Sequence, residues 1–222
     1  MKINVFLPMK MVNERFPNKN IIDFQGMPLF NHILKTISGI EIIDFIDIFA
    51  STDEYKKYLV VSDARIRFVK RDKNLDSSDT SISQVIHKYC INSDADLILM
   101  IHATSPMLNE NTILKCLENV ISGNFDSAAT MIAIREFAYF NDNPINFDPT
   151  QPLPRLQDIK PILAEQNGLW VFKRVEFLNQ HKRVLGKTYF HVIGGTEAMD
   201  IDFKSDLDYL KYTLKDNSDR NV

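Results

Sequence analysis

Glycine is scarce in this chain, with seven residues in 222. Neither GxxxxGK[ST] nor GxGxxG occurs, which excludes a P-loop and the Rossmann dinucleotide fingerprint. The five histidines lie apart, without HxxxH or HxH spacing, and this argues against a zinc site. No stretch approaches the roughly 18 consecutive apolar residues of a membrane span. The short motifs of many nucleotide-binding, zinc and membrane proteins are therefore missing.

Cysteine and net charge are also low. The two cysteines, Cys90 and Cys116, each fall in a helical apolar pattern without CxxC spacing, so we expect buried free thiols and a reducing compartment. The N-terminus lacks the pattern of a signal peptide, so we expect a cytoplasmic protein. The formal net charge is -3 and no dense basic stripe occurs, which argues against a nucleic-acid binder. A hydrophobic content of 45% is ordinary for a globular chain of this length.

Short apolar runs alternate with helical stripes along most of the chain. Strands are predicted at 3–7, 45–49, 66–69, 97–101, 169–172 and about 189–193. Helices are predicted at 28–37, after Thr52 or Asp53, at 82–89 behind a Thr80 or Ser81 cap, at 113–121 behind an Asn109 cap, from about 175, and at 205–214. The alternation predicts an α/β fold with a mostly parallel sheet covered by helices on both faces.

The alternation stops between about 134 and 164. This stretch contains five prolines, several aromatic residues and few helix signals. Long irregular insertions in a domain are usually functional. We therefore expect one domain over residues 1–222 with an inserted arm at 135–165, and a polar tail that frays after Lys215.

A cationic loop at residues 8–20 follows the first predicted strand. It carries Lys10, Arg15 and Lys19, together with asparagine side chains. Ligands of open α/β sheets bind outside the carboxyl ends of the strands, and three spaced cations there could contact several phosphate oxygens. The alternative is a solvated basic loop.

Near the C-terminus, Asp200 and Asp202 alternate along an extended segment, which places both carboxylates on one side. Carboxylate oxygens suit Mg²⁺, which usually takes one or two of them and completes its shell with water and phosphate. The alternative is a surface pair that caps the last helix. Asp206 is expected at the start of that helix, where a negative charge is favourable.

These segments also resemble a family when they are read in order. The loop 8–20 aligns without a gap with P-A-R-G-G-S-K-x-x-P-x-K-N, and residues 71–86 (RDKNLDSSDTSISQVI) with R-P-x-x-L-x-x-D-x-S-x-x-x-V-I. Residues 99–108 (LMIHATSPML) resemble L-L-Q-P-T-S-P-L, and 155–158 (RLQD) with 166–170 (QNGLW) resemble R-R-Q-[DE] followed by N-G-A-I-Y. Residues 200–207 (DIDFKSDL) match D-I-D-x-x-x-D-L. The chain thus resembles the acylneuraminate cytidylyltransferases, the CMP-sialic acid synthetases, and Arg15 is closer to the related Kdo cytidylyltransferases.

The resemblance implies a Rossmann-like nucleotidyltransferase (GT-A-like) sheet and a CTP-dependent enzyme. Such an enzyme transfers CMP to the anomeric hydroxyl of a nonulosonic (sialic-type) acid, uses Mg²⁺, releases pyrophosphate and serves cell-surface glycan synthesis. The implied nucleotide-binding residues are Pro8, Lys10, Arg15, Lys19, Asn20, Arg71 and Ser81. The implied acceptor-binding residues are His102, Thr104, Ser105, Arg155, Gln157 and Asn167. Lys19, Asp200 and Asp202 are the implied catalytic residues, with the two aspartates as metal ligands. The arm is implied to pair two subunits in a homodimer.

Several alternatives stay open. His102 stands where the family has Gln, either as a general base or as a substitute hydrogen-bonding contact. For Arg155 and Gln157 the alternative to an acceptor contact is a loop salt bridge. Gly168 could bring the backbone close to the sugar or serve only the turn, and the arm could fold back as a lid. Departures from the family pattern (Lys10 for Arg, Met11 and Val12 for Gly, His102, and Ala103 for Pro) also permit a different anionic acceptor, such as a phosphonate or another keto-sugar. A third reading is a catalytically silent binding module, against which the retained Lys19 and aspartate pair count.

Overall fold

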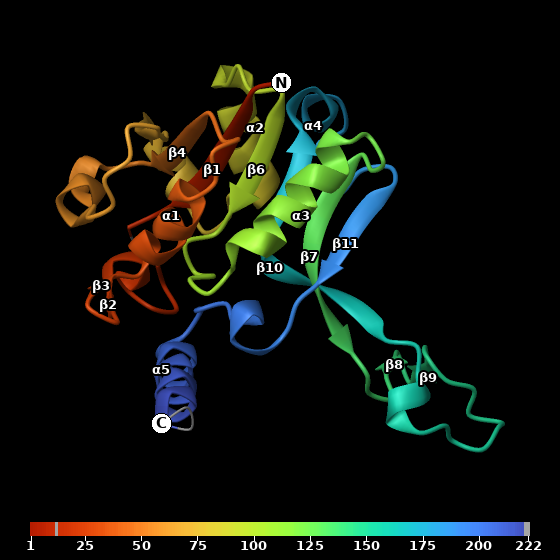
Figure 1. The fold of residues 1–222 in the computed structure, drawn as a ribbon. Helices are drawn as coiled ribbons and strands as arrows, with labels where there is room; N and C mark the ends of the chain where they lie inside the picture. The colour runs from red at the N-terminus through yellow and green to blue at the C-terminus, as the bar shows by residue number, and fades with distance from the viewer. Residues whose placement is uncertain (12, 220–222) are drawn as a thin grey trace.

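A seven-stranded sheet forms the centre of the molecule (Figure 1). The computed structural model describes residues 1–11 and 13–219, so the substitution at position 12 lies outside the described residues. The strands lie in the spatial order β11-β7-β10-β6-β1-β4-β5. Their bounds are β1 (Ile3–Met9), β4 (Phe45–Ala50), β5 (Ile66–Lys70), β6 (Leu97–Ile101), β7 (Ser127–Ile134), β10 (Ile162–Lys173) and β11 (Thr188–Val192).

The expected mostly parallel pairing is confirmed. β1 is parallel to β4 and β6, β4 to β5, and β7 to β11, whereas β10 runs antiparallel between β6 and β7. The four strands β5, β4, β1 and β6 therefore direct their carboxyl ends to one edge, where parallel α/β sheets bind ligands.

Helices cover both faces of this sheet. The covering helices are α1 (Phe30–Ser38), α2 (Ile82–Asn92), α3 (Glu110–Ile121) and α4 (Arg174–Gln180), whereas α5 (Lys204–Asp219) packs against the loop after β1. Alternate residues of each central strand point to opposite faces. Leu97, Leu99 and Ile101 of β6 pack in a cluster with α1 and α3, whereas Ile98 and Met100 pack in a second cluster with α2 and α4.

The caps expected from the sequence set the starts of two helices. The Ser81 hydroxyl accepts from the backbone of Gln84, whose side chain in turn accepts from the Ser81 backbone, so α2 begins with a capping box. The Asn109 side chain accepts from Thr112 at the start of α3. The expected helix after Thr52 is instead a short 3-10 helix, Asp53–Tyr58, although Thr52 does cap it.

Three expectations about the second half need correction. β7 is a strand that was not expected, because its segment SAATMIAI is rich in small residues and has no strand-like alternation of apolar and polar positions. β10 begins at Ile162 rather than near Leu169, and its first part pairs with β7 before a bulge between Glu165 and Trp170. The last helix ends at Asp219 rather than near Leu214, so it includes the first residues of the expected polar tail.

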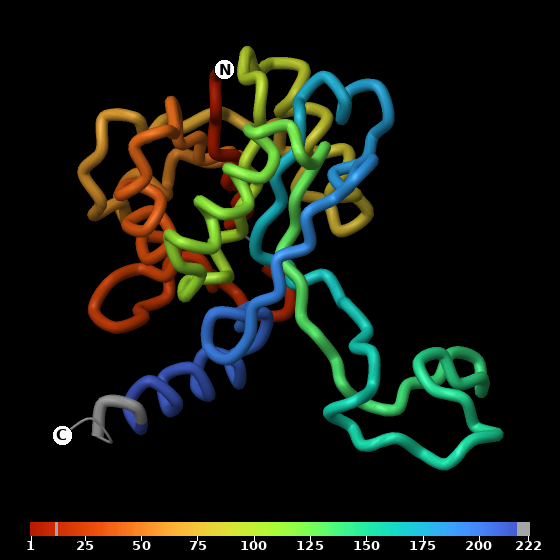
Figure 2. Tube along the Cα trace, turned by 45° about the vertical axis from the view of Figure 1, so that its right-hand side comes forward, coloured from red at the N-terminus to blue at the C-terminus, as the bar shows by residue number. Residues whose placement is uncertain are grey.

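The expected arm leaves the end of β7 and returns at β10. It contains the two-stranded pair β8 (Tyr139–Phe140) and β9 (Asn143–Pro144) and a 3-10 helix at Leu156–Asp158. Both views show it extending away from the sheet (Figures 1 and 2). It is therefore not a lid folded over the carboxyl edge in this conformation.

A third apolar cluster brings the two ends of the chain together. Phe16 of the loop after β1 packs with Ile201 and with Leu207 and Leu210 of α5. The first loop and the Asp200–Asp202 segment are consequently neighbours in space.

Candidate active site

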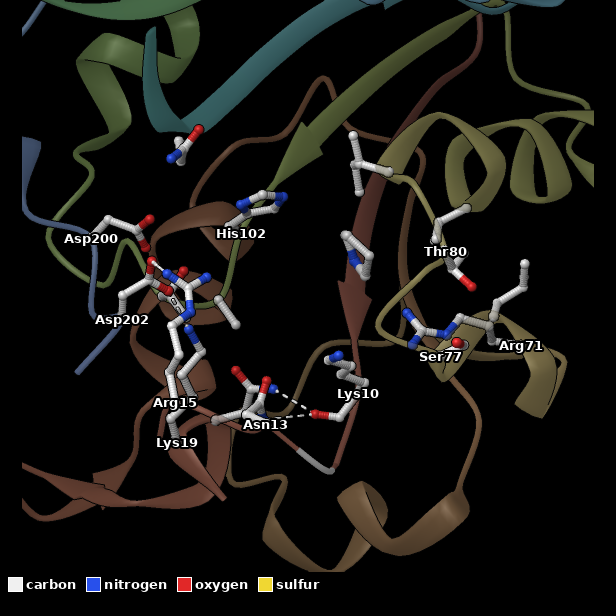
Figure 3. A pocket seen from close by; sticks show the side chains of 18 of the residues that line it. Lys10, Asn13, Arg15, Lys19, Arg71, Ser77, Thr80, His102, Asp200 and Asp202 are labelled. Atoms are coloured by element: carbon white, nitrogen blue, oxygen red, sulfur yellow. Dashed lines mark hydrogen bonds and ion pairs between the residues drawn. The ribbon is translucent and has the colours of Figure 1, made fainter. Parts of the chain in front are cut away.

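A cavity of about 460 Å³ opens at the carboxyl edge of the parallel strands. Figure 3 shows Asp200 and Asp202 on one side, together with Arg15 and Lys19. Arg71, Ser77 and Thr80 lie on the opposite side, and His102 and Lys10 lie between. The volume is within the range of ordinary ligand sites, about 300–1,000 Å³.

Two asparagines hold the loop after β1 in place. Asn13 Nδ2 donates to the Lys10 carbonyl at 3.0 Å, and Asn20 Nδ2 donates to the same carbonyl at 3.3 Å (Figure 3). Asn20 is buried and also donates to the Tyr55 hydroxyl at 3.1 Å. Burial raises the pKa of Tyr55 to about 12, so this phenol stays protonated. These hydrogen bonds fix the backbone of the loop, and the Lys10 side chain lines the cavity.

The two remaining loop cations meet Asp202. Lys19 Nζ lies 2.7 Å from Asp202 Oδ1 and 3.1 Å from the Ile201 carbonyl, and Arg15 Nη1 lies 2.7 Å from Asp202 Oδ2. Burial raises the pKa of Asp202, but the hydrogen bonds and charges of Lys19 and Arg15 outweigh it and lower that pKa below its usual value. Asp202 is ionised at neutral pH as a result.

Asp200 differs from Asp202 in its surroundings. Its Oδ1 atom is buried and has no hydrogen-bond partner among the described residues. Burial raises the pKa of Asp200, and the hydrogen bond from Thr104 offsets this only in part. A buried oxygen without a partner is costly in a protein unless a ligand completes it.

This donor set fits a magnesium ion. Both carboxylates line one wall of the cavity, as the alternation of the segment predicts. Among residues 1–11 and 13–219 no group of three or more His, Cys, Asp or Glu side chains is arranged to hold a metal. Mg²⁺ does not need one, since it is usually bound through one or two carboxylates together with substrate phosphates.

Arg71 supports the opposite wall. Its side chain is 4% exposed, pairs with Asp76 and lines the cavity. Asp76 also accepts from the Ser51 hydroxyl. The Arg71 Nε atom is buried and has no hydrogen-bond partner among the described residues. Ser81 does not line the cavity: it caps α2, and the neighbouring Thr80 and Ile82 line it instead.

His102 directly follows β6 and lies at the centre of the cavity edge. Its backbone N–H donates to the Gly168 carbonyl of β10 at 3.0 Å, and its ring meets Trp170 edge-on at 5.2 Å between centroids. Burial lowers the pKa of His102 to about 4, and the charges of Arg183 and Lys19 act in the same direction. The ring is neutral at pH 7, so it can form hydrogen bonds but carries no charge.

The neighbours of His102 divide between cavity and core. Asn167 and Thr104 line the cavity, as expected. Ser105 is fully buried and accepts a hydrogen bond from Gln166 Nε2 at 3.3 Å, so it supports the wall from behind. Gly168 lies within β10 rather than in a turn, and a Cβ there would lie 2.4 Å from Gln166 Oε1 and 3.0 Å from Ser105 Oγ. Close packing therefore explains Gly168.

Arg155 and Gln157 lie in the arm and do not line the cavity of their own chain. Arg155 pairs with Asp158 at 2.7 Å and its side chain is 73% exposed. The loop salt bridge considered from the sequence therefore exists, and within one chain the arm does not bring these residues to the other expected acceptor contacts.

Several cavity residues were absent from the expected site. They are Asn13, Leu75, Ser77, Thr80, Ile82, Val85, Ala103 and Arg183. All of them except Arg183 lie inside the segments 8–20, 71–86 and 99–108 that resemble the family, so membership of these segments was an available signal. Arg183 follows α4 in a segment with no motif, and only the folded structure places it at the site.

A cavity with loop cations and a carboxylate pair, at the carboxyl edge of this sheet, is the arrangement expected of an α/β nucleotidyltransferase. A family model described as cytidylyltransferase matches residues 5–210. The chain therefore belongs to the cytidylyltransferase family, whose members are CTP-dependent nucleotidyltransferases. No helix in the described part of the chain is long and apolar enough to span a bilayer.

Curated relatives agree with this assignment, and solved structures share the fold. The chain is 28% identical to a pseudaminic acid cytidylyltransferase of Campylobacter jejuni, over 98% of both chains. It is 23% identical to N-acylneuraminate cytidylyltransferase A of Danio rerio, over 86% of this chain and 45% of that protein. Its fold resembles a CMP:2-keto-3-deoxy-manno-octonic acid synthetase complexed with CTP, with a TM-score of 0.70, 13% identity and coverage of 98% and 100%. It also resembles 4-diphosphocytidyl-2C-methyl-D-erythritol synthase of Anaerococcus prevotii, with a TM-score of 0.72, 14% identity and 96% coverage of each chain.

Proposed function

We propose that this enzyme transfers CMP from CTP to the anomeric hydroxyl of a nonulosonic acid and releases pyrophosphate. The observation that carries the proposal is that the loop cations, the Asp200–Asp202 pair, His102 and Asn167 all line the same cavity. The full-length similarity to a pseudaminic acid cytidylyltransferase supports an acceptor of this class. The retained Lys19 and aspartate pair favour an active enzyme over a silent binding module.

In the proposed complex the cytosine and ribose occupy the side of Arg71 and Thr80. The triphosphate extends over the loop after β1, where Lys10, Arg15 and Lys19 neutralise its charge. Arg15 and Lys19 are paired with Asp202 in this structure, so binding the triphosphate redistributes these contacts. Arg15 and Lys19 would therefore bind the triphosphate tightly only once Asp202 has another partner.

Asp200 and Asp202 would hold Mg²⁺. When bound, the ion polarises phosphoryl oxygens and offsets the charge that develops on the leaving group. The protein itself holds the acceptor in line with the α-phosphorus. The anomeric oxygen forms a bond to this phosphorus, the bond to the bridging oxygen breaks, pyrophosphate leaves and the hydroxyl proton passes to solvent. His102, neutral at pH 7, is proposed as a hydrogen-bonding contact to the acceptor.

The arm is proposed to join two subunits. Tyr139, Phe140 and Leu153 are 62%, 68% and 63% exposed, an apolar surface that a second copy would cover. Such pairing could carry Arg155 and Gln157 toward the neighbouring subunit's site, which would reconcile their place in the arm with an acceptor role.

Pyrophosphate release tests the proposed function. The purified chain is assayed with Mg²⁺, each of the four NTPs, and a panel of pseudaminic acid, legionaminic acid, N-acetylneuraminic acid and Kdo. Release with CTP and at least one of these acids supports the proposal. CTP binding without release for any acid, but with release for a phosphonate, would contradict the acceptor class. CTP binding without release for any compound would favour the silent module.

A further inference from the structure

Arg183 is held in a defined orientation at the edge of the cavity. Its guanidinium carbon lies 3.9 Å from the centre of the Trp170 ring, and Nη2 lies 2.9 Å from Glu165 Oε2. The same carboxylate oxygen accepts from Trp170 Nε1 at 3.0 Å. The Trp170 ring therefore packs against the guanidinium group, and Glu165 holds one of its nitrogens by a hydrogen bond. Arg183 is 23% exposed at its side chain and lines the cavity.

Most donors of this guanidinium remain available. An arginine offers five N–H donors in a planar fork. Within residues 1–11 and 13–219, Glu165 is the one group that accepts a hydrogen bond from Arg183. An oriented guanidinium with free donors at a cavity wall is suited to bidentate pairing with a carboxylate or phosphate.

The position of Arg183 separates it from the nucleotide contacts. The cationic loop follows β1, and the Arg71 wall follows β5, on one half of the sheet. Glu165 and Trp170, which hold Arg183, belong to β10, on the other side of β6. Arg183 therefore lies in the half of the cavity that the proposed nucleotide leaves for the acceptor.

Among the described basic side chains near the acceptor half of the cavity, Arg183 is the one left to pair with an acceptor carboxylate. His102 is neutral at pH 7 because burial lowers its pKa to about 4. Arg15 and Lys19 are paired with Asp202 on the wall of the proposed metal site. Arg155, which the sequence suggested as the carboxylate partner, is paired with Asp158 in the arm.

We infer that Arg183 pairs with the carboxylate of the acceptor and selects acidic over neutral sugars, while Glu165 and Trp170 position it. This inference rests on the proposed function. It assigns acceptor specificity to a residue outside the motifs that identify the family. It also explains the role of Glu165, since that carboxylate fixes the guanidinium without occupying its whole fork.

The test compares an acid with its neutral analogue. Wild type, Arg183→Gln, Arg183→Lys and the matched control Lys182→Gln are assayed with pseudaminic acid or, if the wild type prefers it, N-acetylneuraminic acid. Each is also assayed with the C1 amide of the same sugar. Lys182 is the exposed neighbour of Arg183, so its variant removes the same charge from the same segment.

In wild type and Lys182→Gln we expect the acid to be preferred over the amide by about 10- to 100-fold in kcat/KM, as for one charge-assisted contact. In Arg183→Gln this preference should fall to about threefold or less, with the KM for CTP changed less than about twofold. Arg183→Lys keeps the charge but loses the fork, so it should lie between the two. The Arg183→Lys variant also allows the test to be made if Arg183→Gln does not fold.

Binding is measured separately through fluorescence. Trp170 is the single tryptophan of the chain and contacts Arg183, so titration with the acid should change its emission in wild type and Lys182→Gln. If the emission of Arg183→Gln changed with the same midpoint acid concentration as that of wild type, the inference would be overturned. An unchanged acid-to-amide ratio in Arg183→Gln, with loss of that ratio in Arg155→Gln, would also overturn it and leave the proposed function intact. Absence of pyrophosphate release by wild type with every acid would contradict the proposed function and this inference with it.

Discussion

Lys19 Nζ lies 2.7 Å from Asp202 Oδ1, although the two residues are 183 positions apart in the sequence. The pair joins the loop after β1 to the segment before α5, and the apolar cluster of Phe16, Ile201 and Leu207 lies beneath it. Lys19 is 13% exposed and Asp202 29%, so water screens this pair less than a surface ion pair. The same carboxylate thus restrains a cation that we propose binds the triphosphate, and it belongs to the proposed metal site.

Asp202→Asn should separate these two roles. Turnover with CTP and Mg²⁺ should fall at least about 100-fold, since the variant loses a carboxylate that we propose holds the metal. Without Mg²⁺, the variant should bind CTP more tightly than wild type, because Lys19 and Arg15 are released from their partner. Calorimetric CTP titrations with and without Mg²⁺ measure both effects. The control is Asp208→Asn on the exposed side of α5, and wild-type turnover in Asp202→Asn would contradict the metal assignment.

Asp200→Asn should lose activity and gain stability. Burial raises the pKa of Asp200, so the folded state disfavours the charged carboxylate. The folded protein therefore binds this proton more tightly than the unfolded chain, and the resulting stability is lost as pH rises through the folded pKa. At pH 7 the neutral amide removes that penalty. We expect a higher Tm in metal-free buffer together with at least a 100-fold loss of turnover; an unchanged or lower Tm would show that the charge is not penalised.

His102→Gln tests a pH dependence of stability. The pKa of His102 is lowered from its ordinary 6.5 to about 4, so between these values the unfolded chain binds the proton and the folded protein does not. The stability that the neutral ring contributes is therefore present above pH 6.5 and is lost as pH falls toward 4. The Tm of wild type should fall more steeply than that of His102→Gln across this window, by a few degrees, at about 2–4 °C per kcal/mol. Parallel Tm curves from pH 4 to 7 would argue against a depressed pKa.

The arm variant Phe140→Asp tests the proposed dimer. Light scattering should give twice the mass of one chain for wild type and a single-chain mass for the variant, because a charge in a buried apolar contact is costly. Tyr212→Asp is the control, since Tyr212 on α5 is 70% exposed, close to the 68% of Phe140. A wild-type monomer, or equal dissociation of both variants, would refute pairing through the arm.

Much of the fold follows from local patterns. The strand β6 has the bounds 97–101 that its apolar run predicts, because a strand buried on both faces is apolar throughout. The caps Ser81 and Asn109 are readable because they satisfy backbone groups within three residues of themselves. β7 escaped prediction because its small residues carry no periodic pattern, and pairing with β10 and β11 makes it a strand.

The alternation of the elements, the cationic loop and the aspartate pair can be read from the sequence, because they depend on neighbouring residues and on spacing. Which of these side chains meet depends on the fold. In the folded protein Asp202 pairs with Lys19, Arg155 lies outside the cavity of its own chain, and Arg183 lines that cavity. The physical reason is that strand order and the packing of distant segments set these contacts, and no local pattern encodes them.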